Sequence, residues 1–591
     1  MSDDLDWTES GPRSRRFDDV YFSAVDGLAE SRAVYLAGAG LPQAWLGRQR
    51  FTVGELGFGT GLNIAALLQL WRETRPAGGR LSIFSVEAYP ITREAAARAL
   101  ANWPELTDAA APLLDGWPDG RRGFHRIDLP GFDASLDLYI GEVAEALAAW
   151  DGLADAWFLD GFAPAHNPEM WRDEVLALTA ERSAPGARAA TFTVAGQVRR
   201  GLATAGFEVE RRPGFGRKRE RLEAIRPGAP WAVTPPRSAV VIGAGVAGAA
   251  LVRALQALGV ACSLVDADGL GSGASGNPAA LATPRFDAGL GPPARLHAQA
   301  FARAVRLYRD SGAVFAEGAL QLETPSRSRD RFARVAGWDG FAPESLRLLS
   351  AAEASLRLGE PSAIGGMEVR DALVLEPRIV LEAWTAGCEV RIARFVSLLR
   401  REGLWRVLGG DGGELAAGEI VCLAMGADTA AFFPAGRLRH VRGQLEHTEA
   451  LAFSGTAAAW GGYAIPTPGG GVLFGATHGR DDVGRDLRGE DRARNLDELA
   501  KGRPVLAAGM AALSPDAIHS RAAIRTAPPD HMALAGPIPG QPGAHILTGL
   551  GGRGFTLAPL LAEHVAALAV GAPSPLPRDL ARLVAPGRFS T

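Results

Sequence analysis

The sequence predicts an α/β protein with two nucleotide-binding folds in tandem and an α+β segment inserted into the second. Two glycine-rich turns, at residues 57–61 and 243–248, each follow an apolar strand and precede a helix-forming run. A proline-rich stretch separates them, and 591 residues are too many for one hydrophobic core. We therefore expect a Rossmann-like first domain, a linker and a second domain of the dinucleotide-binding type.

Composition and charge place the chain among ordinary folded proteins. Hydrophobic residues make up 47% and charged residues 22%, which excludes a disordered tail protein or a fibre. The net charge is −4, so the chain as a whole does not attract nucleic acid, and any such contact would need a local basic patch. The three cysteines lie far apart and the ten histidines form no HxH or HExxH motif, so we expect neither a disulfide framework nor a metal site. The acidic N-terminus and the shortness of the apolar runs predict no signal peptide, no membrane span and a cytoplasmic location.

Proline marks the domain boundary. The stretch Arg226–Ser238 (RPGAPWAVTPPRS) is typical of an extended linker, because proline fixes φ and removes backbone donors. We predict a first domain over residues 1–226, the linker over 227–238 and a second domain over 239–591. Within the second domain, short β-like runs replace the alternation of strands and helices, so we place a substrate domain at approximately 319–410 and 431–515.

The first glycine turn, in Phe51–Asn63 (FTVGELGFGTGLN), lets the backbone approach a ligand beside a helix N-terminus. Its glycines are Gly57, Gly59 and Gly61. An acidic residue follows each of three later strands: Glu87 is placed to accept ribose hydroxyls, Glu142 to receive an adenine amine, and Asp160 opens the sequence DGFAP. These residues predict a ligand at the carboxyl edge of a parallel sheet. The alternatives are tight turns without a ligand and a helix-capping role for Asp160.

This E-x-G-x-G-x-G pattern resembles that of S-adenosylmethionine-dependent methyltransferases, and DGFAP resembles the Asn/Asp-Pro-Pro-aromatic signature of N-methyltransferases. The resemblance implies S-adenosyl-L-methionine as cofactor and Asp160 as the methyl-transfer residue. An amine that attacks a sulfonium methyl needs acceptors for its hydrogens and a lone pair held in line. Phe162 would pack over the acceptor.

The second glycine turn, in Ala239–Ala250 (AVVIGAGVAGAA), has the spacing G-x-G-x-x-G, and its glycines are Gly243, Gly245 and Gly248. A strand that ends in Asp266 follows, close to the interval of roughly 20 residues at which a dinucleotide fold places its ribose-binding acid. The turn therefore predicts a dinucleotide site, with a tight turn that binds nothing as the alternative.

Three further segments resemble the glycine/D-amino-acid oxidase family of flavoproteins. They are GSGASGN (Gly271–Asn277), IVCLAMGA (Ile420–Ala427) and ILTGLGGRGFTLAP (Ile546–Pro559). The resemblance implies FAD as cofactor, and a helix that starts in the last segment would stabilise negative charge on reduced flavin. Beyond the glycine turn and Asp266, the implied cofactor contacts are Ser275, Gly276, Asn277, Gly551 and Gly552.

The same resemblance implies a site for a substrate carboxylate. Arg525 precedes Asp530 by five residues (RTAPPD), and its guanidinium suits bidentate contact with a carboxylate. Tyr463 matches the family's tyrosine that donates to the same carboxylate, and Arg553 would assist from the flavin-facing turn. The alternatives are a surface salt bridge for Arg525 and a core position for Tyr463. At Ala533 the sequence departs from the family, in which many members carry proline.

The order methyltransferase, linker, oxidase, with FDDVYFS (Phe17–Ser23), DGFAPAHNPEMW (Asp160–Trp171) and GFGRKRE (Gly214–Glu220), resembles the family of bifunctional tRNA 5-methylaminomethyl-2-thiouridine biosynthesis proteins. The resemblance implies that the oxidase half removes the carboxymethyl group from 5-carboxymethylaminomethyl(-2-thio)uridine at the tRNA wobble position. The methyltransferase half then methylates the exposed amine. Glu142 departs from the family, in which aspartate is expected.

Two other hypotheses stay open. One is a fused glycine- or sarcosine-type amine oxidase and N-methyltransferase that acts on small metabolites. The other is a non-catalytic flavin half that docks RNA, with methyl transfer as the only chemistry.

The basic stretch Arg199–Arg221 is the candidate tRNA contact. It holds eight Lys or Arg residues against three Glu residues, and such a patch neutralises phosphates. A solvated charged face is the alternative. Phe162, Trp171 and Phe215 are candidates for stacking on a flipped wobble base.

Overall fold

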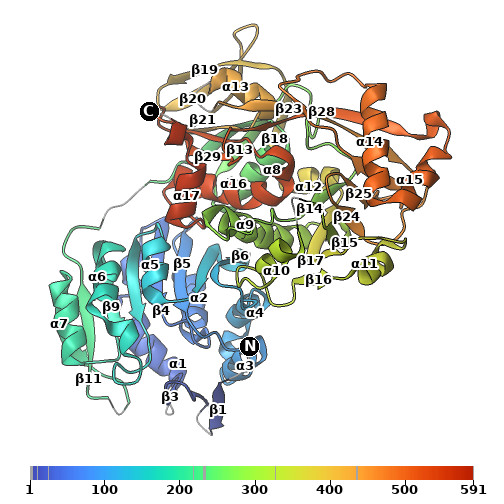
Figure 1. Ribbon diagram of the computed structural model, residues 1–591. Helices are drawn as coiled ribbons and strands as arrows, with labels where there is room; N and C mark the ends of the chain where they lie inside the picture. Colours follow the sequence, from blue (N-terminus) through green and yellow to red (C-terminus); the bar gives the residue numbers. More distant parts are fainter. Residues whose placement is uncertain are drawn as a thin grey trace. The chain divides into compact units, whose positions relative to one another are not determined.

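The computed structural model describes residues 4–8, 11–23, 26–216, 218–230, 234–325, 328–433 and 437–589. The chain divides into two compact units (Figure 1). The first unit contains Met1–Pro235 with Val570–Arg578, and the second contains Pro236–Ala569 with Asp579–Thr591. The division therefore falls within the proline-rich linker, of which residues 231–233 lie outside the described residues.

The first unit is built on an eight-stranded sheet with the order β10-β11-β9-β8-β4-β5-β7-β6. The five strands from β9 to β7 in this order are parallel, whereas the pairs β6–β7, β9–β11 and β10–β11 are antiparallel. The strands are β4 (Arg50–Leu56), β5 (Arg80–Glu87), β6 (Gly123–Leu129), β7 (Ala134–Ile140), β8 (Ala154–Leu159), β9 (Ser183–Thr191), β10 (Glu208–Pro213) and β11 (Glu220–Ile225).

Helices cover both faces of this sheet, because alternate strand residues point to opposite sides. Val53, Ile83 and Phe158 pack in one buried cluster with α2 (Leu62–Thr74) and α4 (Thr107–Asp115). Phe84 and Trp157 pack in another cluster with α5 (Val143–Ala149), α6 (Asp173–Glu181) and α7 (Gly196–Thr204). The remaining helices of this unit are α1 (Gly27–Glu30), a π-helix over Ser31–Leu36, and α3 (Arg93–Leu100).

Two smaller pieces complete the first unit. An N-terminal three-stranded antiparallel sheet contains β1 (Leu5–Thr8), β2 (Gly11–Ser14) and β3 (Asp19–Val20). The late segment Val570–Arg578 also belongs to this unit, and the Arg578 guanidinium lies 3.7 Å from the Asp151 carboxylate.

The second unit begins with a six-stranded sheet in the order β18-β13-β12-β22-β30-β29. All neighbouring pairs are parallel except β29–β30. The strands are β12 (Ser238–Ile242), β13 (Ala261–Asp266), β18 (Glu389–Ile392), β22 (Ile420–Leu423), β29 (Leu534–Pro537) and β30 (Ala544–Thr548). Beside it, β19 (Phe395–Arg401), β20 (Leu404–Gly409) and β21 (Glu414–Gly418) form a small sheet of three.

A ten-stranded mixed sheet forms the second layer of this unit. Its strands are β14 (Ala280–Ala282), β15 (Val314–Leu322), β16 (Leu346–Leu349), β17 (Gly366–Leu375), β23 (Arg439–Thr448), β24 (Ala457–Ala459), β25 (Tyr463–Pro466), β26 (Val472–Gly475), β27 (Gly479–Arg480) and β28 (His519–Ala527). The sheet thus draws on residues 280–375 and 439–527, which differs from the predicted segments 319–410 and 431–515. Residues 389–418 pair with other sheets instead.

The helices of the second unit are α8 (Val246–Ala257), α9 (Pro292–Arg309), α10 (Arg329–Ala336), α11 (Ala351–Leu358), α12 (Pro377–Trp384), α13 (Thr429–Phe432), α14 (Gly489–Gly502), α15 (Pro504–Ala511), α16 (Gly554–Val570) and α17 (Arg578–Val584). The predicted fold class is therefore confirmed. Two α/β nucleotide-type folds follow one another, and the second carries an inserted α+β layer.

Candidate active sites

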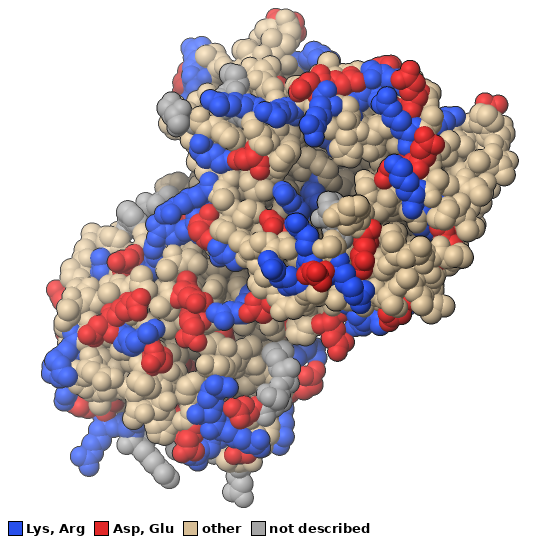
Figure 2. All heavy atoms as spheres, in the orientation of Figure 1, with Lys and Arg blue, Asp and Glu red and all other residues tan. Residues whose placement is uncertain are grey.

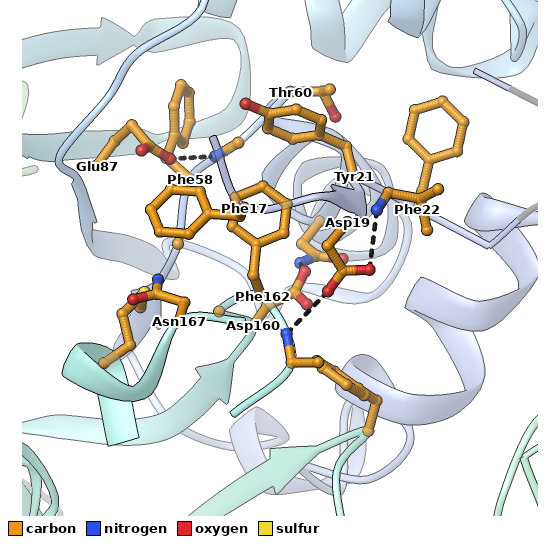
Figure 3. Close-up of a pocket in the computed structure, with 18 of the residues that line it drawn as sticks. Phe17, Asp19, Tyr21, Phe22, Phe58, Thr60, Glu87, Asp160, Phe162 and Asn167 are labelled. Carbon is orange, nitrogen blue, oxygen red and sulfur yellow. Dashed lines mark hydrogen bonds between the residues drawn. The ribbon is translucent and has the colours of Figure 1, made fainter. Parts of the chain in front are cut away.

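A cavity of about 560 Å³ lies in the first unit where β4, β5 and β8 end (Figure 3). The carboxyl ends of parallel strands meet at one sheet edge, which brings the predicted residues together. Those that line the cavity are Gly57, Gly59, Glu87, Glu142 and Asp160. Gly61 does not line the cavity; it precedes α2 with a φ of +79° and shapes the turn.

Gly57 cannot be replaced by a larger residue without strain. Its φ is +100°, and a Cβ at this position would lie 2.2 Å from the carbonyl oxygen of Asp160. The ends of β4 and β8 therefore approach each other, at the floor of the site, more closely than a side chain permits.

Glu87 is tied to the glycine turn. The Gly59 N–H donates to Glu87 Oε2 at 2.9 Å, and the Tyr89 N–H donates to Oε1 at 2.9 Å. Burial raises the pKa of Glu87, and these backbone hydrogen bonds counteract part of the rise. Each carboxylate oxygen has a second lone pair, so Glu87 can still accept ribose hydroxyls. Glu142 precedes α5, is exposed and makes no capping hydrogen bond.

Asp160 is held by two side chains from distant parts of the chain. The Tyr35 hydroxyl donates to Asp160 Oδ1, and Asn63 Nδ2 donates to Oδ2 at 2.7 Å. Burial raises the pKa of Asp160 to about 6, and the two hydrogen bonds limit the rise. Side chains, and not the backbone of a helix, therefore bind this carboxylate, which titrates close to neutral pH.

The N-terminal segment closes one side of the same cavity. Asp19 Oδ2 accepts from the Ala163 N–H at 2.9 Å, which ties this segment to the DGFAP loop. Phe17 stacks on Phe162 with ring centroids 4.9 Å apart, and both rings lie near Asp160 in Figure 3. The sequence placed Phe17 and Asp19 in a family motif but gave them no role.

Of the three aromatic candidates for base stacking, Phe162 and Phe215 line the cavity, whereas Trp171 does not. Trp171 is 4% exposed, and its indole N–H donates to the Phe162 carbonyl oxygen at 2.8 Å. Its ring packs in the core beneath the DGFAP loop and is not available for stacking.

Glutamates neutralise much of the basic stretch Arg199–Arg221. The residues paired with glutamates are Arg211, Arg212, Lys218 and Arg221. Within the described part of the stretch, three arginines have no ion pair: Arg199, Arg200 and Arg219. Arg217 lies outside the described residues. On the face shown in Figure 2, basic and acidic side chains are interspersed. The local positive charge is thus smaller than the sequence predicts.

A second cavity, of about 920 Å³, lies in the second unit where β12, β13, β22 and β30 end. This volume is at the upper end of the range of about 300–1,000 Å³ for ligand pockets, as a dinucleotide requires. The predicted residues that line it are Gly243, Gly245, Asp266, Ser275, Asn277, Tyr463, Arg525, Gly551, Gly552 and Arg553.

Gly248 and Gly276 do not line this cavity but allow its backbone to pack. A Cβ at Gly248 would lie 1.8 Å from the Gly243 carbonyl oxygen, and a Cβ at Gly276 would lie 1.9 Å from the Gly271 carbonyl oxygen. At Gly243, with a φ of +109°, a Cβ would lie 2.4 Å from the carbonyl oxygen of Ala424. Glycine here keeps the turn close to the neighbouring strand end and leaves room for a ligand.

Asp266 and Ser275 fix the shape of the glycine turn. Asp266 Oδ2 accepts from the Ala244 N–H at 2.7 Å, and Oδ1 accepts from the Gly269 N–H at 2.8 Å. Ser275 Oγ accepts from the Val246 N–H at 3.0 Å, in the first turn of α8. Ser275 thus satisfies one free N–H group at the helix N-terminus.

Arg525, on β28, and Tyr463, on β25, face the second cavity. Arg525 Nη2 donates to the Thr477 carbonyl oxygen at 2.8 Å, and no described carboxylate pairs with the guanidinium. Burial lowers the pKa of Arg525, and Tyr463 opposes this shift. Burial also raises the pKa of Tyr463, so its hydroxyl stays a donor. A half-buried guanidinium without a carboxylate partner, beside a hydroxyl, is suited to bind a carboxylate.

Arg553 is positioned by Thr283, because Arg553 Nη1 donates to the Thr283 carbonyl oxygen at 2.9 Å and to its Oγ1 at 2.8 Å. Asp530 does not line the cavity and accepts from Arg588 Nε at 2.9 Å. Three basic side chains that line the cavity belong to no motif and were missed by sequence reasoning: Arg394, His478 and Arg485.

Among the described residues, no group of three or more His, Cys, Asp or Glu side chains is placed to hold a metal ion. The helices in the described ranges include none with the length and apolar character needed to cross a membrane.

Comparison with known proteins defines the class of each half. Residues 104–227 match the family model of an S-adenosyl-L-methionine-dependent methyltransferase, and residues 238–568 match that of an FAD dependent oxidoreductase. The chain is similar in fold to iminodiacetate oxidase from Chelativorans sp. BNC1, with a TM-score of 0.50 and 22% identity over 59% of this chain and 98% of that one. The chain is thus a two-domain enzyme that joins an S-adenosylmethionine-dependent methyltransferase to an FAD-dependent oxidoreductase.

Two relatives match the chain from end to end. Both are named tRNA 5-methylaminomethyl-2-thiouridine biosynthesis bifunctional protein MnmC. The protein from Caulobacter sp. (strain K31) is 58% identical, and that from Caulobacter vibrioides is 55% identical; each match covers 99% of this chain and 98% of the relative. The chain belongs to the MnmC family. The resemblance predicted from the motifs is confirmed, and with it both cofactors.

Proposed function

We propose that the chain performs two successive reactions on one nitrogen of a tRNA wobble uridine. The second unit removes the carboxymethyl group from 5-carboxymethylaminomethyl(-2-thio)uridine, and the first unit methylates the resulting 5-aminomethyl group. The observation that carries the proposal is that one chain contains a half-buried pair suited to bind a carboxylate, Arg525 and Tyr463, and a carboxylate suited to hold an amine, Asp160. The names of the relatives, which specify tRNA 5-methylaminomethyl-2-thiouridine biosynthesis, support it.

The oxidation follows from the chemistry of an N-substituted glycine. Arg525 and Tyr463 hold the carboxylate, and the buried site keeps the amine unprotonated. The glycine turn, Asp266 and Ser275 would hold FAD, which would supply the hydride acceptor for the methylene carbon. A carbon–nitrogen double bond forms as the hydride and the amine proton leave. Water then adds to this carbon, the carbon–nitrogen bond breaks, and glyoxylate and a primary amine are released.

The methylation uses that primary amine as nucleophile. Gly59, Glu87 and Glu142 would hold S-adenosyl-L-methionine, which would supply the methyl group. Asp160 accepts a hydrogen of the amine, aims its lone pair at the methyl carbon, and takes the proton released when the new bond forms. Tyr35 and Asn63 fix the carboxylate in the orientation needed for this contact.

Methyl transfer is expected to fall as the pH drops through about 6, because the acid form of Asp160 can no longer accept the proton. Since the Tyr35 hydrogen bond lowers the pKa of Asp160, Tyr35→Phe should move this inflection to higher pH. In Asp160→Asn the acceptor oxygen does not titrate, so the inflection should disappear from the remaining activity. Single-turnover methylation of aminomethyl tRNA between pH 5 and pH 8 measures the effect. An inflection that is unchanged in Asp160→Asn would assign it to another group.

We further propose that the RNA is held partly by Arg199, Arg200 and Arg219, whose side chains have no ion pair among the described residues. Phe17 and Phe162, stacked beside Asp160, are suited to contact the base. A cytoplasmic location fits a tRNA substrate. The rival activity on small metabolites gains no support from the names of the relatives.

An anaerobic titration of the flavin tests the proposal. We expect tRNA that carries 5-carboxymethylaminomethyluridine to bleach the flavin absorption in about stoichiometric amounts, and free glycine or sarcosine to leave it unchanged. The experiment records the absorption spectrum of the full-length holoenzyme as each compound is added. Bleaching by the free amino acids alone would instead assign a metabolite oxidase. An absence of bleaching by every compound would assign a non-catalytic flavin half.

A further inference from the structure

A side cavity of about 210 Å³ adjoins the flavin cavity in the second unit. Gln321 and Arg553 line both cavities, so the two are neighbours. The other side chains that matter for its chemistry are Arg285, Arg331, Phe286 and Phe332. None of the residues assigned to FAD or to the substrate carboxylate lies here except Arg553.

The lining of this side cavity carries positive charge without a compensating acid. It includes three guanidinium groups and no carboxylate. Arg285 and Arg331 have no hydrogen bond or ion pair within the described chain, whereas Arg553 is held by Thr283. Asp287, two residues after Arg285, does not line the side cavity and accepts from the Gly289 N–H at 2.9 Å. A pocket lined by arginines with donors available to a ligand is suited to bind an oxyanion.

A buried histidine lies beside these arginines and adds no charge of its own. His297, on α9, is 3% exposed, and its Nδ1 has no hydrogen-bond partner among the described residues. Burial, together with the smaller effect of the positive charges of Arg553 and Arg285, lowers the pKa of His297 to about 3. The ring is therefore neutral at physiological pH, and the two arginines keep their full charge for a ligand.

The arginines continue outward from the flavin cavity. A further hollow of about 230 Å³ shares Ala288 and Arg331 with the side cavity and adds Arg334. Its one acid, Asp330, lies in the first turn of α10. Guanidinium groups thus line consecutive hollows from Arg553 to Arg334. This arrangement suits a nucleic-acid strand, in which each phosphate carries a negative charge.

We propose that the side cavity binds a backbone phosphate of the RNA next to the nucleotide whose base enters the flavin cavity. Arg285 and Arg331 form the phosphate contacts, and Phe286 provides an apolar wall for the adjoining ribose or base. The substrate carboxylate already has Arg525 and Tyr463, so these arginines serve another anion. The inference rests on the proposed tRNA substrate.

Removing both free arginines tests the inference. We expect Arg285→Ala/Arg331→Ala to raise the KM for tRNA in flavin reduction about tenfold at low salt, with kcat nearly unchanged. The slope of log KM against log salt should become shallower by about one, because one phosphate contact releases roughly 0.7–0.9 counterions. Arg285→Lys/Arg331→Lys keeps the charges and should recover most of the affinity and the slope.

A matched control removes two charges elsewhere in the same unit. Arg378→Ala/Arg401→Ala changes side chains that are 82% and 70% exposed and should leave KM and the salt slope as in the wild type. Equal changes of KM and of the salt slope in both double variants would show that only the overall charge matters, and would overturn the inference. So would loss of inhibition by inorganic phosphate in Arg285→Ala/Arg331→Ala with an unchanged KM for tRNA, because the cavity would then bind a free anion. If wild-type flavin is not reduced by the tRNA at all, the proposed function fails instead.

Discussion

Replacing Asp160 with alanine is expected to lower the rate of methyl transfer about 100-fold or more while flavin-dependent oxidation continues at its normal rate. A positioned acid–base group contributes about 10²–10⁴-fold to a rate. Asp160 is the carboxylate at the centre of the first cavity, where Tyr35 and Asn63 hold it. Without it the amine has no acceptor for its hydrogens and no fixed lone pair. Aminomethyl uridine should therefore accumulate in tRNA treated with the variant.

Nucleoside analysis of the treated tRNA measures oxidation and methylation separately. Asp155→Ala is a suitable control, because Asp155 is also largely buried, on β8, and its Oδ1 accepts from Arg48 at 2.7 Å. It does not line the cavity, so this variant should lose stability without a specific loss of methylation. If oxidation and methylation fall together in Asp160→Ala while the thermal unfolding temperature stays normal, the two sites are not independent.

The second large effect is expected from Arg525→Ala, which should lower kcat/KM for flavin reduction by tRNA about 100-fold or more. Truncating one partner of a buried charge pair costs about 2–5 kcal/mol, and each 1.36 kcal/mol is tenfold. The Arg525 guanidinium has no carboxylate partner among the described residues, so its charge is available to the substrate. Arg525→Lys keeps the charge but loses the bidentate contact, so its kcat/KM should lie between that of the wild type and that of Arg525→Ala.

Rapid mixing of the oxidised variant with tRNA measures flavin reduction directly. Methylation of tRNA that already carries the aminomethyl group serves as the internal control and should be normal in both Arg525 variants. The variant should also still take up flavin, because Arg525 lies on β28 and not in the glycine turn at residues 243–248. Normal reduction by tRNA in Arg525→Ala would remove this residue from the substrate site.

The glycine turns and the acids at the strand ends could be predicted because their spacing in the sequence follows from the local geometry of the backbone. At Gly57 and Gly243 a neighbouring backbone carbonyl leaves no space for a Cβ. Only glycine fits there, so the glycines in the sequence indicate that two backbone segments approach closely. The partners of Asp160 could not be predicted in this way. Tyr35 and Asn63 are 125 and 97 residues away in sequence, and only the packing of α2 and the π-helix against the sheet brings them to the carboxylate.

Strand pairing limited the prediction of the second unit for a similar reason. The β-pattern of residues 389–418 indicates strands but does not state which sheet they join. β18 hydrogen-bonds in parallel with β13, at the edge of the nucleotide-binding sheet, whereas β14, outside the predicted segment, pairs with β17. The basic stretch Arg199–Arg221 shows the same limit, because Glu30 and Glu223, which lie outside it in sequence, pair with Lys218 and Arg221.

The assignment of Val570–Arg578 to the first unit affects how the two enzymes can be divided. The polypeptide leaves that unit at the linker and contributes to it again near its C-terminal end, where Arg578 lies beside Asp151. A gene truncated at residue 235 therefore encodes a first unit that lacks one of its own segments. After a single proteolytic nick in the linker, no peptide bond joins the two fragments, and residues 570–578 of the first unit remain on the C-terminal fragment.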